Sequence, residues 1–322
     1  VLWRPPTGNG WPRRVKDEQT FGNAPILGGM PELPEVETLR RQLAPALAAK
    51  RIERLEVLDP KWGSPIAGSE LAGLIEGRTI ERLERRGKYL IFDLGDELYL
   101  ICHLRMTGNF LYDAEPSVAY QRAVFELEAG HTLRFTDPRR FGTAEVIIGG
   151  DALDEYFAGR LGIEPFSGAL DGPALKSMAS GKRTSIKAFL LDQRAVAGIG
   201  NIYADEALFR AEVHPLREAG RLKPAQYELL ATTIQDALQA GLDAGGATID
   251  DFRHADGLYG SFQDEFLVHR RAGEPCPRCG NEVEKIVVVG RGTYLCGRCQ
   301  PRPRGATRRR ATRRASRSGQ QR

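Results

Sequence analysis

The chain has 322 residues, enough for two domains that each have a core of their own. Its hydrophobic fraction of 41% and charged fraction of 27% are ordinary for a globular protein, and no run of about 18 apolar residues occurs, which argues against a membrane span. The formal net charge of +4 includes nine arginines in residues 301–322, a stretch without acidic residues, so the rest of the chain carries −5 (4 − 9). This balance excludes a uniformly basic protein, and any contact of the folded part with nucleic acid must use a local basic face.

The first segment shows no regular period. Residues 1–29 are rich in Pro, Gly and Arg and lack the apolar stretch of a secretory signal, so we expect a disordered extension and no export. A helix is predicted directly after it, because Pro34 is tolerated in a first helical turn and apolar residues follow at helical spacing: Val36, Leu39, Leu43 and Leu47.

The stretch from Arg51 to Ile148 predicts β structure. Short apolar runs are separated by turn residues such as Gly95-Asp96 and Ala129-Gly130. Several short strands joined by tight turns are typical of a sandwich or a barrel. The expected strands are Tyr89–Leu94, Glu97–Leu104, Ala123–Leu127, Leu133–Thr136 and Ala144–Ile148.

From about Leu153 to Gly245 the pattern becomes helical. One apolar stripe is expected to contain Leu229, Leu230, Ile234 and Leu238. A Gly-rich segment, Gly245 to Gly260, follows. The Arg-rich residues 301–322 are predicted to be a disordered tail that adds salt-dependent, sequence-independent affinity for DNA.

Four of the five cysteines form two C-x-x-C pairs, and the fifth, Cys102, lies in an apolar run. Two pairs at this spacing are typical of a tetrahedral zinc site with four thiolates, which leaves no open position for a catalytic water. This usage suits a reducing cytoplasm better than a disulfide framework. Lys285–Val289 and Thr293–Leu295 are expected to form a hairpin with Arg291 at its tip. The predicted ligands of one structural Zn²⁺ are Cys276, Cys279, Cys296 and Cys299.

The segment Met30–Glu37 reads MPELPEVE. Taken alone, it is a helix start with acidic residues near the positive end of the helix dipole. Together with further motifs, it resembles the bacterial formamidopyrimidine-DNA glycosylase family from Met30 to Gln300, with the motifs in the same order. The further motifs are Arg86–Leu90 (RGKYL), His103–Gly108 (HLRMTG), Asp137–Gly142 (DPRRFG), Gly198–Ala204 (GIGNIYA) and the four-cysteine finger.

The resemblance implies an α+β multidomain fold. An N-terminal β-sandwich with an N-terminal helix is expected over residues 30–150, a helix–two-turn–helix domain with a lesion loop over 151–262, and a zinc-finger β-hairpin over 263–300. The implied activity is base-excision repair of double-stranded DNA, in which oxidised purines such as 8-oxoguanine and formamidopyrimidines are released and the strand is then cleaved by β,δ-elimination. A monomer in the bacterial cytoplasm, with the nucleoid, is expected.

The family's nucleophile is the secondary amine of an N-terminal proline, which corresponds to Pro31. Such an amine forms a Schiff base at C1′ of the damaged nucleotide, and it titrates near pH ~8, so part of it is unprotonated at neutral pH. Glu32 corresponds to the adjacent proton donor. Lys88 resembles the proton donor for β-elimination or a phosphate contact. Arg291 resembles the donor for δ-elimination, and we favour an electrostatic role for it because arginine rarely releases its proton.

Base excision from a duplex requires the nucleotide to be extruded, which leaves a space in the stack. Met106, Arg139 and Phe141 match the family's trio that fills this space. Phe141 corresponds to a wedge between base pairs, and Arg139 to a probe of the orphaned cytosine. Core packing is the alternative for Met106 and Phe141, but the polar turn before Phe141 favours exposure.

Other residues match the family's DNA contacts and supporting carboxylates. Lys182 is equally compatible with a solvated loop, and the stretch Asp251–Gln263 matches the lesion-capping loop. The matching DNA contacts are His103, Lys182 and Asn201, and the matching carboxylates are Glu35 and Glu206. Arg122 stands where the family commonly has a histidine that contacts DNA, so the cation is kept but its geometry differs.

A proline preceded by other residues has an amide nitrogen, which cannot form a Schiff base. We therefore expect residues 1–29 to lie upstream of the true start and the mature enzyme to begin at Pro31. If residues 1–29 are retained, the alternative is a damage-binding protein without catalysis. A second alternative is the related endonuclease VIII group, which prefers oxidised pyrimidines but usually has Gly where this chain has Leu33.

Overall fold

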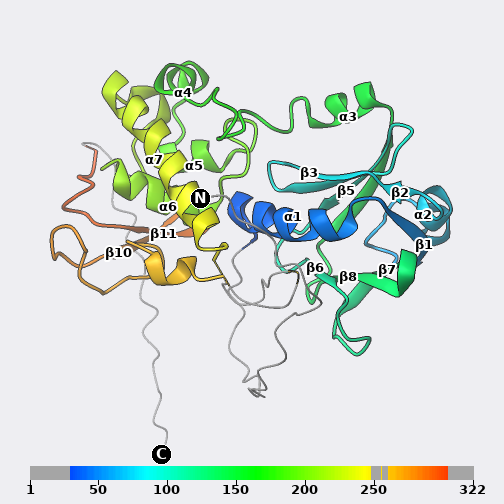
Figure 1. The fold of residues 1–322 in the computed structure, drawn as a ribbon. Coiled ribbons are helices and arrows are strands. Elements are labelled where there is room, and N and C mark those ends of the chain that lie inside the picture. Colours follow the sequence, from blue (N-terminus) through cyan, green and yellow to red (C-terminus); the bar gives the residue numbers. More distant parts are fainter. Residues whose placement is uncertain (1–29, 248–254, 256–259, 304–322) are drawn as a thin grey trace, which may run out of the picture.

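The computed structural model describes residues 30–247, 255 and 260–303. The expectations for residues 1–29, for most of 251–263 and for 304–322 concern residues outside these ranges. The described chain forms a pair of sheets, a group of helices and a two-stranded finger (Figure 1). None of its helices combines the length and the apolar character needed to cross a membrane.

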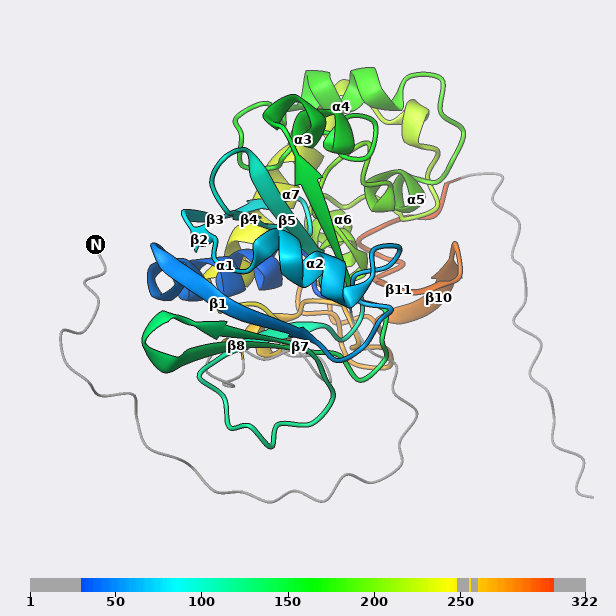
Figure 2. The ribbon, with the colours of Figure 1, turned by 90° about the vertical axis from the view of Figure 1, so that its right-hand side faces the viewer.

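Two antiparallel sheets form the N-terminal sandwich, with the orders β2-β1-β7-β8-β6 and β3-β4-β5-β9. In the side view, β1, β7 and β8 lie below β3, β4 and β5 (Figure 2). Apolar residues of both sheets share one core. The strands are β1 (Lys50–Val57), β2 (Thr79–Ile80), β3 (Arg82–Arg86), β4 (Tyr89–Asp93), β5 (Leu98–His103), β6 (Asn109–Tyr112), β7 (Gln121–Leu127), β8 (His131–Thr136) and β9 (Thr143–Ile148).

Helix α1 (Leu33–Leu47) lies between the sandwich and the helical domain (Figure 1). Leu33, in its first turn, is buried in the core of the helical domain. The apolar residues that predicted the helix are all buried in the sandwich core instead: Val36, Leu39, Leu43 and Leu47. The start of α1 is therefore fixed by both domains.

Two short helices belong with the sandwich. Helix α2 (Gly68–Ile75) packs next to β1, and α3 (Gly150–Phe157) buries Leu153 and Phe157 against Ile91 and Ile101 of the second sheet. Helix α3, which begins at Gly150, thus packs against the second sheet of the sandwich in a small cluster separate from the core between the sheets.

The helical domain consists of α4 (Gly172–Ala179), α5 (Ile186–Leu191), α6 (Asn201–Arg210) and α7 (Pro224–Asp243). Helix α7 buries Leu230, Ile234 and Leu238, but Leu229 is 46% exposed. The predicted apolar stripe was therefore wrong at Leu229, because neighbouring residues of a helix point in directions about 100° apart.

The finger hairpin pairs β10 (Glu284–Val288) with β11 (Arg291–Leu295). Val288 lies opposite Arg291, which leaves Val289-Gly290 as a two-residue turn with positive φ at both positions. This geometry is the favoured one for a tight hairpin. The predicted turn at Gly290–Gly292 was therefore wrong, and Arg291 is the first residue of β11.

Candidate active site

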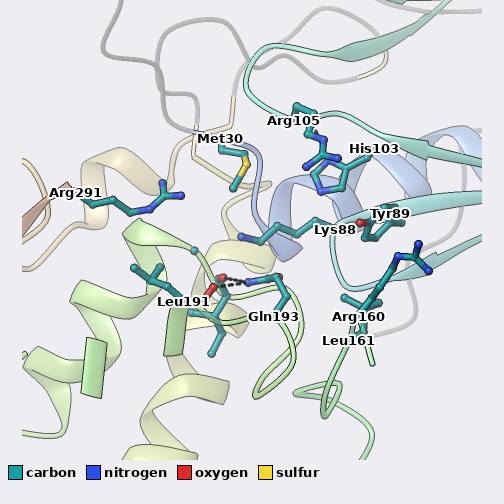
Figure 3. A pocket seen from close by; sticks show the side chains of 12 residues that line it. Met30, Lys88, Tyr89, His103, Arg105, Arg160, Leu161, Leu191, Gln193 and Arg291 are labelled. Carbon is teal, nitrogen blue, oxygen red and sulfur yellow. Dashed lines mark hydrogen bonds between the residues drawn. The ribbon is translucent and has the colours of Figure 1, made fainter. Parts of the chain in front are cut away.

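A pocket lies where the sandwich, the loop before α6 and the finger hairpin meet (Figure 3). Lys88 enters it from the turn between β3 and β4, and Arg291 enters it from β11, so their side chains point toward one another (Figure 3). No aspartate or glutamate is among the described residues that line it, whereas four cations are: Lys88, Arg105, Arg160 and Arg291. Such a pocket attracts anionic groups, for example the phosphates of a nucleic acid.

Glu32 lies at the junction of α1 and α6, next to this pocket. Its carboxylate accepts hydrogen bonds from the backbone N–H groups of Gly200 at 2.6 Å and Ile202 at 2.9 Å. Gly200 lines the pocket, and a Cβ at this position would lie 2.3 Å from the carboxyl carbon of Glu32. The N-terminus of α6, with its partial positive charge, therefore fixes a carboxylate directly after Pro31.

Glu35 is buried one helical turn after Glu32. Its Oε1 accepts hydrogen bonds from the Tyr203 hydroxyl at 2.8 Å and the Ala247 N–H at 2.7 Å, and its Oε2 accepts one from the Glu32 N–H at 2.9 Å. Burial, with the charge of Glu32 as the second cause, raises the pKa of the Glu35 carboxyl to about 7. A group that exchanges its proton near neutral pH therefore lies beside Glu32.

The surroundings of Lys88, at the β3–β4 turn, and of His103, at the end of β5, lower the pKa values of both side chains. Burial lowers the pKa of the Lys88 amine, and the charge of Arg291 lowers it further. Burial also lowers the pKa of His103 to about 3, with Arg105 and Lys88 as further causes. The Nδ1 atom of His103 accepts a hydrogen bond from the Arg105 N–H at 2.9 Å. The neutral ring therefore carries its proton on Nε2 and is a hydrogen-bond donor.

Asn201 connects the helical domain to the strand that carries Arg291. Its Nδ2 donates a hydrogen bond to the carbonyl oxygen of Gly292 at 2.9 Å. Asn201 is the first residue of α6, directly after Gly200. The loop that holds Glu32 and the strand that holds Arg291 are thus joined by one side chain.

Lys187, which sequence reasoning left without a role, makes a second connection to the same strand. It is fully buried, and its Nζ donates hydrogen bonds to Asp205 Oδ1 at 2.5 Å and to Thr293 Oγ1 at 2.8 Å. Asp205 also accepts a hydrogen bond from the backbone N–H of Tyr294 at 3.3 Å. A buried ion pair of α5 and α6 therefore holds β11 next to the pocket. No local pattern in the sequence indicates this connection, because Lys187, Asp205 and Thr293 come from three separate segments.

The loop Asp137–Gly142, called the wedge loop below, carries two of the predicted space-filling residues. Asp137 is fully buried and accepts hydrogen bonds from the N–H groups of Phe141 at 2.8 Å and Gly142 at 2.7 Å. Phe141 is 52% exposed, which confirms that it is not a core residue. The guanidinium carbon of Arg139 lies 5.1 Å from the centre of its ring.

Met106, the third residue of the predicted trio, is half-buried. The hydroxyl of Thr107 donates a hydrogen bond to Asp137 and accepts one from the Arg139 N–H at 3.2 Å. These contacts tie the segment of Met106 to the loop. The residue next to Met106 is therefore joined to the loop that carries Arg139 and Phe141.

The four finger cysteines lie close enough together to hold a metal ion. Their Sγ atoms all lie within 4.8 Å of one another, and they flank the β10–β11 hairpin in sequence: Cys276, Cys279, Cys296 and Cys299. This arrangement suits a structural metal site and contains the four cysteines that the sequence predicted as ligands. Cys102 is buried in the core of the sandwich.

Three family models match consecutive parts of the chain. The formamidopyrimidine-DNA glycosylase N-terminal domain matches residues 30–144, the formamidopyrimidine-DNA glycosylase H2TH domain matches 161–253, and the zinc finger found in FPG and IleRS matches 273–302. The chain belongs to the formamidopyrimidine-DNA glycosylase family. This family membership confirms the resemblance that the sequence motifs indicated.

Known members of the formamidopyrimidine-DNA glycosylase family are similar over most of the chain. The enzyme of that name from Symbiobacterium thermophilum is 45% identical over 280 residues, which are 86% of this chain and 91% of the relative. That from Heliobacterium modesticaldum is 41% identical over 84% of this chain and all of its own. The structure of Lactococcus lactis Fpg with abasic-site DNA has a TM-score of 0.79 and 36% identity, and that of MutM with carbocyclic 8-oxo-G DNA has 0.79 and 37%. Each covers 84% of this chain and 100% of its own.

Several residues that match family positions lie outside the pocket. Lys182 is exposed, and Arg122 donates a hydrogen bond from Nε to the carbonyl oxygen of Asp137 at 2.8 Å. Glu206 is fully buried and accepts hydrogen bonds from the N–H groups of residues 267–269. Conversely, Arg160 and Gln193 line the pocket although sequence reasoning gave them no role.

Pro31 itself is buried, and the residue before it lines the pocket. The side chain of Met30 lies at the part of the pocket toward which Lys88 and Arg291 point (Figure 3). While Met30 is attached, the nitrogen of Pro31 is an amide. The lesion loop expected at Asp251–Gln263 lies mostly outside the described residues.

Proposed function

We propose that this protein is a monomeric, bifunctional DNA glycosylase and AP lyase that removes oxidised purines from double-stranded DNA. The substrate class is supported by the names of the relatives and by similar structures that hold Fapy-dG, 8-oxo-G or abasic-site DNA. The observation that carries the proposal is that Pro31 and the fixed carboxylate of Glu32 adjoin a pocket lined by cations. A phosphate backbone fits this pocket better than a neutral or cationic substrate does.

The proposed reaction begins with the amine of Pro31. Its lone pair forms a bond to C1′, the bond from C1′ to the base nitrogen breaks, and the base leaves with a proton. Opening of the sugar ring then places a hydroxyl at C4′ and leaves a Schiff base on the proline nitrogen. Loss of a proton from C2′ expels the 3′-phosphate, and a further elimination expels the 5′-phosphate.

The neighbouring residues have complementary tasks in this proposal. Glu32, oriented by the N-terminus of α6, donates and accepts protons at the sugar. Lys88, whose pKa is lowered, exchanges a proton during elimination more readily than an exposed lysine does. Arg291 attracts the phosphates on either side of the lesion through its permanent charge. Four thiolates with no open position fit Zn²⁺, which we propose as the structural metal of the finger.

The decisive experiment is borohydride trapping on a duplex that contains 8-oxoguanine or an abasic site. A chain that starts at Pro31 is expected to form a covalent adduct and to cleave the strand, because its amine is free. The matched control is the chain that starts at Val1, in which the same nitrogen is an amide. Failure of the Pro31-start protein to form an adduct would refute the enzyme hypothesis.

A second candidate function is damage binding without catalysis. The position of Met30 in the pocket favours it for any chain that retains the residues before Pro31. Such a chain is expected to bind an abasic-site duplex but to leave it uncut. The same assay on oxidised pyrimidines tests the endonuclease VIII-like alternative, for which we expect much slower release than for oxidised purines.

A further inference from the structure

The conformation of the wedge loop is stabilised by a residue outside the loop as well as by Asp137 within it. Arg140, which stands between Arg139 and Phe141, forms a two-point ion pair with Asp59, at 2.5 Å from Nε to Oδ2 and 2.8 Å from Nη2 to Oδ1. Arg140 has a φ of 60°, which is uncommon for a residue other than glycine. The ion pair therefore stabilises a backbone conformation that the loop sequence alone disfavours.

Asp59 joins this loop to the end of β1. Its side chain is only 4% exposed, whereas that of Arg140 is 47% exposed. Its backbone N–H donates a hydrogen bond to the Arg122 carbonyl oxygen at 3.1 Å, and its Oδ2 lies 3.8 Å from Arg122 Nε. Arg122 in turn donates to the carbonyl oxygen of Asp137 at 2.8 Å. Asp59 is thus connected to the wedge loop at two points, directly at Arg140 and through Arg122 at Asp137.

A buried carboxylate is an unexpected feature of a surface that binds DNA. It repels phosphates and loses hydration on burial. At Asp59, the guanidinium groups of Arg140 and Arg122 offset both the repulsion of phosphates and the loss of hydration. Hydrogen bonds from Arg140 are the main cause that lowers the pKa of Asp59 to about 2, so the pair persists throughout the neutral range. Because the carboxylate reduces the local positive charge, its benefit to DNA binding lies in the geometry of the loop.

We propose, on the basis of the glycosylase function above, that Asp59 is a positioning residue for the wedge loop. By holding Arg140, it sets Phe141 at the position where it separates the base pairs. It also sets Arg139 where its guanidinium meets the base opposite the lesion. Asp59 itself contacts neither the lesion nor the opposite base.

The test compares Asp59→Asn with a matched carboxylate. The asparagine keeps the size of the side chain and an oxygen for the Lys61 N–H, which Asp59 accepts at 3.1 Å, but it removes the charge that holds Arg140. Asp93→Asn is the control. Asp93 is 7% exposed at its side chain, accepts two hydrogen bonds from the exposed Arg82 at Oδ2 and accepts the N–H of the residue two positions on at Oδ1. It lies at the end of β4, in the other sheet.

Two readouts are measured on chains that start at Pro31. The first is the fluorescence of 2-aminopurine beside a tetrahydrofuran abasic analogue at saturating protein, which reports unstacking and needs no catalysis. The second is the ratio of single-turnover excision rates for 8-oxoguanine opposite cytosine and opposite adenine. Asp59→Asn is expected to lower both by roughly threefold to tenfold relative to Asp93→Asn, a size that lies within the range found for residues of one coupled network. Thermal unfolding should show similar losses in the two variants.

The outcomes separate this inference from the proposed function. Equal fluorescence and equal rate ratios in the two variants would overturn the role of Asp59. If the wild-type chain shows the fluorescence change but no excision, the glycosylase proposal fails and the fluorescence alone decides the role of Asp59. Should Asp59→Asn not fold, Arg140→Lys gives the same test, because lysine keeps the charge but cannot form the two-point pair.

Discussion

At the scale of single residues, Gly200 controls the position of the Glu32 carboxyl group. A methyl group at Gly200 would lie 2.3 Å from the Glu32 carboxyl carbon, so Gly200→Ala must displace the carboxylate. The hydrogen bond that the Glu32 carboxylate accepts from the Gly200 N–H would then be lost. We expect single-turnover release of 8-oxoguanine to fall about a hundredfold or more, the usual size of a general acid–base contribution.

Gly73→Ala is the control for this prediction. Gly73 lies inside α2, and no heavy atom would lie within 4 Å of its new Cβ. Replacing a helical glycine with alanine stabilises a protein by about 0.5–1 kcal/mol, and we expect unchanged excision. An unchanged rate in Gly200→Ala as well would show that the observed position of Glu32 is not needed for catalysis.

Glu35 is predicted to make stability depend on pH near neutrality. Its pKa of about 7 in the folded state lies above the ordinary value of 4.5, so the folded state binds the proton more tightly than the unfolded state does. The resulting stability is complete below pH 4.5 and is lost as the pH rises through 7. Glu35→Gln stays neutral. As the pH rises from about 5 to 8, the free energy of unfolding of the wild type should therefore fall by up to roughly 3 kcal/mol relative to that of the variant.

Glu37 in the same helix is the control for the pH dependence. Although burial opposes the shift, hydrogen bonds and charge from Arg40 lower the pKa of Glu37 to about 2. Its contribution is complete above the ordinary pKa of 4.5 and is lost as the pH falls from there through 2, so the difference between Glu37→Gln and the wild type should change little from about pH 5 to 8. A constant difference for Glu35→Gln over the same range, measured by denaturant unfolding, would contradict the raised pKa.

At the scale of elements, α6 and the finger strand β11 depend on the buried pair of Lys187 and Asp205. Lys187→Met removes the hydrogen bond to Thr293 and leaves Asp205 without its cation. Breaking a buried pair in this way typically costs about 3–5 kcal/mol. We expect a loss of that size in denaturant unfolding, together with weaker binding of an abasic-site duplex because Arg291 loses support.

An exposed ion pair between the helical domain and the finger supplies the control. Arg278 of the finger pairs with Glu212, and their side chains are 40% and 61% exposed. Exposed pairs contribute about 0–1 kcal/mol, so Glu212→Gln should change the free energy of unfolding little. If both variants lose the same small amount, the buried pair is not what holds the finger.

The elements could be predicted from the sequence where their cause is local. The apolar spacing from Val36 to Leu47 placed α1, because burial of one helix face depends on residues within that helix. The finger turn was misplaced, since several turns fit the segment around Gly290 and only the pairing of Val288 with Arg291 decides among them. Leu229 was misassigned because an apolar side chain at a stripe's edge is buried only if another element covers it.

The site residues were predictable from motifs, but their supports were not. Family motifs identified Glu32 and Arg291 as candidates, and both adjoin the same pocket in the structure. The hydrogen bond from Gly200 to Glu32, however, joins residues 168 positions apart. Asp59 lies 81 positions from Arg140 in the same way. Such partners are fixed by the packing of domains, which no local pattern contains.

At the scale of the whole molecule, the pocket depends on the relative positions of the sandwich, the helical domain and the finger. Helix α1 contributes to two cores, and this shared helix fixes the sandwich relative to the helical domain. The finger has its own small core, which includes Phe209 of α6 and the ligand cysteines Cys276 and Cys296. The position of Arg291 relative to Pro31 therefore depends on the folding of the finger, although the finger and Pro31 lie near opposite ends of the described residues.

Removal of the metal should consequently abolish function while sparing the sandwich. Without an ion, four thiols packed within 4.8 Å of one another no longer hold the ends of the hairpin, and small four-cysteine domains rarely stay folded in that state. We expect a chelator to eliminate tight binding to an abasic-site duplex and borohydride trapping. The sandwich core, which contains no finger residue, should keep its near-ultraviolet circular dichroism. Added Zn²⁺ should restore both activities, and undiminished duplex affinity in the metal-free protein would show that Arg291 is positioned by Lys187 and Asn201 alone.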